Sequence, residues 1–161
     1  MYKNSSAGEC PLVVDKSTPS CGNSRFGCWT CTVVEKDNSL SNLVDKGEEW
    51  LEPLLAFRDK LKITTDPTKK HIYRSYKRRI GQVAFKNNTE DTEIIRGPYK
   101  PKYKREFLKD VLEAQEEINR RNPKDVHVDV IRLEELKEIR RIWIKEDNDW
   151  EDTVSRIYNE V

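Results

Sequence analysis

The sequence has no run of apolar residues near the roughly 20 that a membrane-spanning helix needs. Its first residues, MYKNSSAGECPLVV, contain neither the apolar stretch nor the small-residue cleavage site of a signal peptide. We therefore expect a cytoplasmic protein without a membrane partner. Apolar residues make up only 35% of the 161 residues and charged residues 37%. This composition predicts a thin core built from amphipathic helices with broad solvent-exposed faces.

Patterns typical of a hydrolytic or acid–base active site are also missing. The two histidines, His71 and His127, have no partners at catalytic spacing, so we interpret both as solvated or hydrogen-bonded side chains. No Ser–His–Asp arrangement, HExxH motif or pair of carboxylates stands out. The sequence therefore identifies no catalytic residue.

Cysteine is scarce but concentrated at one end of the chain. All four cysteines lie within 22 residues, in the pattern C-x10-C-x6-C-x2-C: Cys10, Cys21, Cys28 and Cys31. A C-x2-C turn brings two thiolates to one metal centre, so we predict a cysteine-rich metal-binding loop over residues 1–38. The spacing leaves zinc and an iron–sulfur cluster equally open. Two disulfides are less favoured, because nothing in the sequence indicates export.

Residues 39–161 are predicted to be mainly helical, with a basic loop and a small β-hairpin at 64–97. The hairpin would pair residues 81–87 with 92–97 across a turn-rich NNTED sequence. The remaining segments carry apolar residues at helical spacing. Helices are expected at 40–46 with a cap at Asn38-Ser39, at 48–61, 102–121 and 132–146, and at 150–160 with a cap at Asp149.

Three finer expectations concern packing. The apolar face of the helix at 48–61 includes one cation, Arg58. Trp29, inside the C-x2-C motif, is expected to pack against that helix rather than to shield a metal. Leu133 is expected on the buried face of the helix at 132–146. Residues 127–130 alternate like a short strand, but the run is too short to predict one.

The net charge of +1 is unevenly distributed along the chain. Residues 61–105 contain 13 Lys and Arg against 4 Asp and Glu, whereas residues 106–161 contain 10 against 16. Basic side chains neutralise phosphates, so DNA contact and a merely solvated face are both open interpretations of the basic stretch. Arg25, between two cysteines, suits either a phosphate contact or a loop salt bridge. The candidate phosphate-binding residues are Arg25, Lys69, Lys70, Arg74, Lys77, Arg78 and Arg79.

Several segments resemble one family of proteins. CGNSRFGCWTCTVV at 21–34 and GEEWLEPLLAFRD at 47–59 are similar to the cysteine-bearing region of the DndC family of DNA sulfur-modification (phosphorothioation) proteins, within the phosphoadenosine-phosphosulfate-reductase-like group. RGPY at 96–99 and LEELKEIRRIW at 133–143 are looser matches. The resemblance covers nearly the whole chain, and its first block is its most specific part.

The resemblance implies a cofactor and partners. In that family four cysteines hold a [4Fe–4S] cluster, and this role carries over to Cys10, Cys21, Cys28 and Cys31. The implied function is sulfur incorporation into the DNA backbone, with DNA and other sulfur-modification proteins, including a cysteine desulfurase, as partners. ATP or a related adenine nucleotide would be used by the full-length protein.

One departure limits what the resemblance implies. The family's phosphate-gripping SGGKDS-type loop does not occur in this sequence. We therefore interpret the chain as the C-terminal part of an α/β nucleotide-hydrolase-like protein, or a truncated relative, that is inactive as an enzyme alone. Two alternatives stay open. One is a strict phosphosulfate or adenylylsulfate reductase, although no cysteine lies outside the loop; the other is a zinc-stabilised nucleic-acid-binding module.

Overall fold

The computed structural model describes residues 29–33, 35–88, 93–124 and 127–161. Within these ranges the chain is mainly helical with one two-stranded antiparallel sheet, so this coarse part of the fold prediction is confirmed. The elements in chain order are α1 (Asn38–Asp45), the 3₁₀-helix η2 (Glu49–Leu51), α2 (Glu52–Ile63), α3 (Lys70–Tyr73), β1 (Ala84–Phe85), the 3₁₀-helix η3 (Lys86–Asn88), β2 (Ile94–Ile95), α4 (Pro101–Arg121), α5 (Leu133–Glu146) and α6 (Thr153–Glu160).

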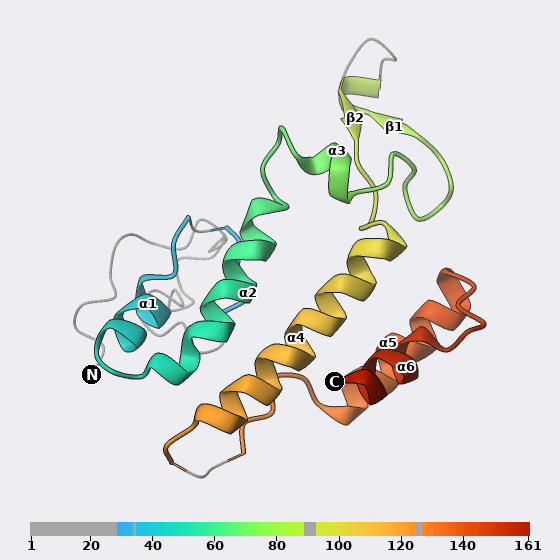
Figure 1. The fold of residues 1–161 in the computed structure, drawn as a ribbon. Helices are drawn as coiled ribbons and strands as arrows, with labels where there is room; N and C mark the ends of the chain where they lie inside the picture. Colours follow the sequence, from blue (N-terminus) through green and yellow to red (C-terminus); the bar gives the residue numbers. More distant parts are fainter. Residues whose placement is uncertain (1–28, 34, 89–92, 125–126) are drawn as a thin grey trace, which may run out of the picture.

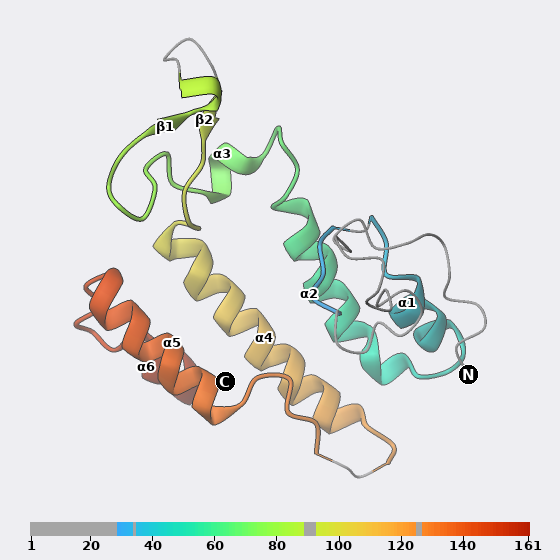
Figure 2. The same ribbon diagram turned by 180° about the vertical axis from the view of Figure 1, so that it is seen from behind.

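Helix α4 occupies the middle of the structure. It has 21 residues, which corresponds to a length of about 31 Å. Helix α2 runs along one side of α4, and α5 and α6 lie along the other, as both views show (Figures 1 and 2). Helix α3 and the small sheet lie beyond the N-terminal end of α4. The helices therefore form three adjacent layers, with the hairpin at one end.

Two apolar clusters hold these layers together, and α4 contributes to both. Leu108 and Leu112 of α4 pack with buried side chains of α5 and α6, including Trp143 and Ile157. Ile118, near the other end of α4, is completely buried in a second cluster with α1 and α2. The apolar spacing that predicts this helix thus corresponds to its buried positions, Leu108, Leu112, Ala114 and Ile118.

A lysine of α2 adds a polar link between α2 and α4. The Lys60 ammonium lies 2.6 Å from a carboxylate oxygen of Glu106 and 2.6 Å from one of Asp110. Partial burial opposes the charged form of Lys60, but hydrogen bonds from the ammonium to Asp110 and Glu106 outweigh it and raise the pKa of Lys60. The lysine is therefore charged and bound to both carboxylates at neutral pH.

The ends of α1 follow from local hydrogen bonds. The carboxylate of Asp37, rather than Asn38 or Ser39 as predicted, accepts from the backbone N–H groups of Ser39 and Leu40. Gly47 adopts a φ of +99° beyond the last turn, and the N–H groups of Gly47 and Glu48 bond to the carbonyls of Val44 and Leu43. This is a Schellman motif, and it confirms that Gly47 ends the helix.

Two expectations for the C-terminal half need correction. Helix α6 begins at Thr153 rather than Trp150, because Asp152 lies in the left-handed region and Asp149 instead binds the N–H and hydroxyl of Thr153. Leu133 is 55% exposed, since it occupies the first position of α5, where the helix has not yet reached the core. The brief alternation at 127–130 forms no strand, as its shortness suggested; the side-chain amides of α4 residues Asn119 and Gln115 bind this backbone.

The basic region is more ordered than the predicted loop. Residues 64–79 contain the short helix α3, and Arg74 forms an isolated antiparallel bridge with Tyr99. The predicted hairpin is confirmed but brief, with Ala84 opposite Ile95 and Phe85 opposite Ile94.

Among the described residues, no helix combines the length and the apolar character that crossing a membrane requires.

The central role of α4 predicts unequal effects of two substitutions. Ile118→Ala should lower the free energy of unfolding by about 2–5 kcal/mol, because it leaves a cavity between α4, α1 and α2. Leu133→Ala removes an exposed side chain and should change the free energy of unfolding by less than about 0.5 kcal/mol. Urea denaturation followed by circular dichroism measures both, and equal effects would contradict the two-cluster description.

Candidate metal centre and basic hollow

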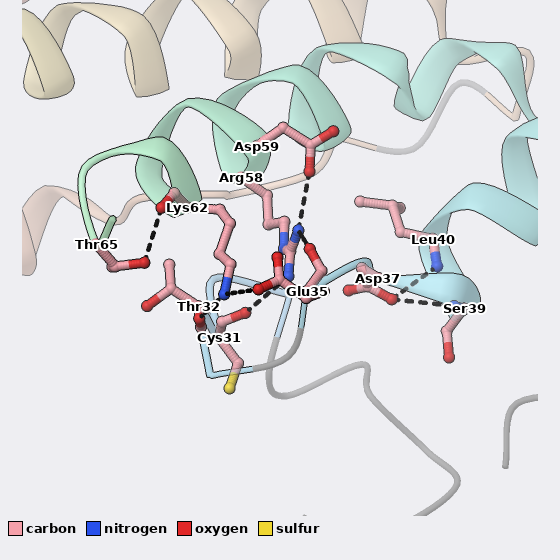
Figure 3. A network of polar contacts seen from close by, with 10 residues as sticks. All are labelled: Cys31, Thr32, Glu35, Asp37, Ser39, Leu40, Arg58, Asp59, Lys62 and Thr65. Carbon is pink, nitrogen blue, oxygen red and sulfur yellow. Dashed lines mark hydrogen bonds and ion pairs between the residues drawn. The ribbon is translucent and has the colours of Figure 1, made fainter. Parts of the chain in front are cut away.

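Cys31 is the one candidate metal ligand that lies within the described residues. It is a free cysteine with a partly buried side chain. It lies in the segment just before α1, residues 29–33 and 35–37, which we call the cysteine segment. Its Sγ projects away from α2, while its backbone carbonyl faces that helix (Figure 3). Cys10, Cys21, Cys28 and Arg25 lie outside the described residues. Within the described ranges, no group of three or more His, Cys, Asp or Glu side chains is placed to hold a metal.

The side chain of Arg58 holds the backbone at Cys31 and at Glu35. The whole residue is buried, with 0% of its surface exposed. Its guanidinium donates to the carbonyl of Glu35 at 2.8 Å and to the carbonyl of Cys31 at 3.4 Å, and it pairs with the Asp59 carboxylate at 2.9 Å (Figure 3). A buried cation is costly unless it is hydrogen-bonded. These contacts offset the cost of burying the charge. The carbonyls of the segment accept from Arg58, and Arg58 in turn fixes the path of the segment's backbone.

One turn further along α2, Lys62 makes a second attachment to the same segment. Its ammonium donates to the carbonyl of Thr32 at 3.1 Å and lies 3.3 Å from the Glu35 carboxylate (Figure 3). Trp29 packs against Phe57, with ring centroids 6.0 Å apart, and against the second apolar cluster. The expected packing of Trp29 on this helix is therefore confirmed.

These contacts bear on whether Cys31 suits a metal. They hold the carbonyl side of the segment against α2 and leave the thiol on the opposite side. Buried structural cysteines usually serve as small apolar side chains of a core, whereas the Cys31 thiol is only partly buried and points away from the helix. This position suits a thiolate ligand of a metal centre on the side of the segment that faces away from α2.

A second feature is a hollow of about 630 Å³ at the N-terminal end of α4. We call it the basic hollow. Five cations and one aromatic residue define it: Arg74, Arg78, Arg79, Arg96, Lys104 and Tyr99. None of the residues that line it is acidic. Its size is typical of a ligand site.

The five cations differ in the partners that already bind them within the protein. Lys104 forms an ion pair with Asp147 at 2.6 Å. The Arg74 guanidinium lies over the Tyr99 ring, 4.1 Å from its centroid, and bonds to the Gly97 carbonyl at 3.4 Å. Arg78 donates to the Arg96 carbonyl at 3.1 Å. Within the described parts of the chain, no carboxylate forms an ion pair with any of the four arginines.

The hollow depends on a close crossing of two backbone segments. Ser75 N–H bonds to the Pro98 carbonyl at 2.9 Å, and Gly97 N–H bonds to the Ser75 carbonyl at 2.8 Å. A Cβ atom on Gly97 would lie 1.8 Å from the carbonyl oxygen of Lys77. Only glycine allows this approach, which places Arg96 beside Arg78 and Arg79.

The predicted basic residues divide into two groups. Arg74, Arg78 and Arg79 line the basic hollow, whereas Lys69, Lys70 and Lys77 do not. Lys69 lies 4.0 Å from Asp66, and Lys77 lies over the Tyr76 ring.

Sequence reasoning missed four further residues: Arg58 and Lys62 at the cysteine segment, and Arg96 and Lys104 at the hollow. For Arg58 the sequence contains one indication, which is its position on an otherwise apolar helix face. Arg96 and Lys104 reach the hollow from the segments on either side of Tyr99, which only the fold reveals.

In comparisons with models of protein families, with curated proteins and with solved structures, nothing matches this chain.

The Arg58 contacts lead to a prediction for the cysteine segment. Arg58→Met should lower the free energy of unfolding by about 2–4 kcal/mol, because it leaves two backbone carbonyls without their donor. It should also speed amide exchange at residues 29–33 more than in α5 and α6. Hydrogen exchange read by mass spectrometry tests this. Arg141→Met, which removes an exposed arginine paired with Glu138 within one helix, serves as the matched control and should leave both quantities nearly unchanged.

The crossing at Gly97 leads to another prediction. Gly97→Ala should force the 75–78 and 96–98 segments apart and destabilise the protein by about 1–3 kcal/mol. Amide exchange at Ser75 should accelerate, because its bond to Pro98 breaks. Gly81→Ala is the comparison: a Cβ there meets nothing within 4 Å, although φ is +81°, so strain is its main cost. If Gly81→Ala exposed the Ser75 amide as much as Gly97→Ala does, close approach would not explain the crossing.

Proposed function

We propose that this chain is the iron–sulfur cluster-bearing part of a phosphoadenosine-phosphosulfate-reductase-like protein that acts in DNA phosphorothioation. The proposed ligands of a [4Fe–4S] cluster are Cys10, Cys21, Cys28 and Cys31. The observation that carries the proposal is the attachment of the Cys31 segment, whose carbonyls are bound by α2 while its thiol points away. Such a segment presents a thiolate at a fixed position, which is what a ligand requires.

Electrostatics supports the choice of an anionic centre. Four thiolates around a cluster leave it with net negative charge, and nearby charges and hydrogen bonds set its potential. Arg58 and Lys62 place two cations against the backbone that carries Cys31. Two cations beside the ligand segment suit a centre of net negative charge.

The role of the cluster within the proposed function is electron supply, sulfur handling or stabilisation of the loop. Arg58 and Lys62 would orient the ligand segment, and Trp29 would cover one side of it.

The proposed partners are DNA and other sulfur-modification proteins, including a cysteine desulfurase. Use of ATP belongs to the full-length protein in this proposal. The proposed location is the cytoplasm, where thiols stay reduced.

Metal analysis of anaerobically purified protein tests the proposal. Stoichiometric iron and acid-labile sulfide, with broad absorption near about 400 nm, would support a cluster. One zinc per chain without sulfide would instead support a zinc-stabilised nucleic-acid-binding module. Transfer of sulfur to DNA by the full-length protein, lost together with the cluster, would separate phosphorothioation from a strict phosphosulfate reductase.

Individual ligand substitutions provide the matching prediction. Changing any one of Cys10, Cys21, Cys28 or Cys31 to Ser should sharply lower iron and sulfide content, because serine is a poorer ligand for soft centres. Thr30→Ser, an exposed change inside the C-x2-C motif, should retain full occupancy. Full iron and sulfide in Cys10→Ser would remove Cys10 from the ligand set, and in Cys31→Ser it would overturn the ligand role argued from the structure.

A further inference from the structure

The basic hollow contains more positive charge than the described residues around it neutralise. Lys104 has Asp147 as a counterion, and Arg74 is held against Tyr99 and Gly97. Arg78, Arg79 and Arg96 line the hollow, and none of them forms an ion pair with a carboxylate within the described ranges. Like charges brought together repel one another, so such a cluster costs stability unless an anion joins it. The arrangement is typical of a site whose counterion is a ligand.

The chemistry of arginine narrows the kind of anion. A guanidinium offers a planar set of donors that matches the oxygens of a phosphate, and it binds them as a bidentate pair. The three arginines come from two crossing segments, 75–79 and 96–98, and all of them line the same hollow. Several guanidinium groups around one hollow suit a tetrahedral oxyanion, whose oxygens point in several directions, better than a flat carboxylate.

Exposed apolar side chains accompany these arginines. Ile80 is 78% exposed and lines the hollow, and Tyr76 nearby in sequence is 53% exposed. A phosphate-bearing ligand with flat apolar bases can use both kinds of surface, whereas inorganic phosphate can use only the arginines.

We infer that the basic hollow binds backbone phosphates of a DNA strand through Arg78, Arg79 and Arg96. This inference rests on the proposed function for the choice of DNA as the phosphate source. It assigns the contact to three arginines around Gly97 and excludes the lysines of the same basic stretch. Arg74 and Lys104 shape the hollow, since Arg74 is stacked on the Tyr99 ring and Lys104 is paired with Asp147. Arg78 also donates to a backbone carbonyl, but it has no ring or carboxylate partner among the described residues.

The test compares two triple variants that remove the same charge. Arg78/Arg79/Arg96→Ala removes three cations that line the hollow, and Lys69/Lys70/Lys77→Ala removes three that do not. Binding of a fluorescein-labelled single-stranded DNA to the full chain is followed by fluorescence anisotropy at several salt concentrations. Thermal unfolding by circular dichroism checks that both variants are folded.

The arginine variant should lose affinity on the order of 100-fold at about 0.1 M salt, and its slope of log affinity against log salt should flatten by about 2. The lysine variant should lose only a few-fold. Equal losses would overturn the inference, because they would mean that overall charge governs binding. Arg78/Arg79/Arg96→Lys keeps the charge and should retain the salt slope while recovering only part of the affinity.

Competition distinguishes the sources of phosphate. Inorganic phosphate and ATP are titrated against the labelled strand. If ATP binding required the three arginines while DNA binding did not, the inference of a DNA strand would be wrong. The cluster proposal is tested separately, by the iron and sulfide content of the protein. Arginine-dependent DNA binding by protein without iron would support the inference even while the cluster proposal failed.

Discussion

Ile118 of α4 packs against α1 and α2, whereas Leu108 and Leu112, two to three turns earlier, pack against α5 and α6. A helix that buries side chains in two directions joins two layers that otherwise have little apolar surface of their own. The scarcity of apolar residues makes this sharing necessary. Both candidate sites depend on it, because α2 carries the contacts to Cys31 and the first turn of α4 carries Lys104 of the basic hollow.

The buried guanidinium of Arg58 is the second constraint. Moving a cation out of water is unfavourable, and the hydrogen bonds from Arg58 to the carbonyls of Cys31 and Glu35 offset that cost. An aliphatic side chain of similar size could fill the same space, but it would leave both carbonyls without a donor. The buried cation therefore fixes the backbone path through the cysteine segment. Lys62 and Trp29 extend the attachment on either side, so that the segment is held at several points along α2.

The sequence predicted the elements whose pattern is local and repetitive. Helix α4 was placed within one residue at its start, since Pro101 and the Asn122-Pro123 pair mark its ends, and the hairpin was found from its β-prone runs. Competition between neighbouring side chains explains one miss, because Asp37 caps α1 in place of Asn38. Gln115 and Asn119 bind the backbone of 127–130, so the brief alternation there forms no strand. At the sites, the charge imbalance indicated a basic region, but it could not separate Arg78 and Arg79 from Lys69 and Lys70. That division depends on the crossing at Gly97, which brings Arg96 in from a distant segment. The roles of Cys10, Cys21, Cys28 and Arg25 stay predictions.

The two candidate sites are mechanically connected through the last turn of α2. Arg58 and Lys62 bind the cysteine segment, and two residues beyond Lys62 the fully buried Thr64 shares a hydrogen bond of 2.7 Å with the hydroxyl of Tyr99. Tyr99 in turn lies beneath the Arg74 guanidinium and packs edge-on against Phe107 of α4. Each contact is short and involves a rigid ring, a helix end or a buried polar group. One continuous set of contacts therefore links the cysteine segment to the basic hollow through the C-terminal end of α2.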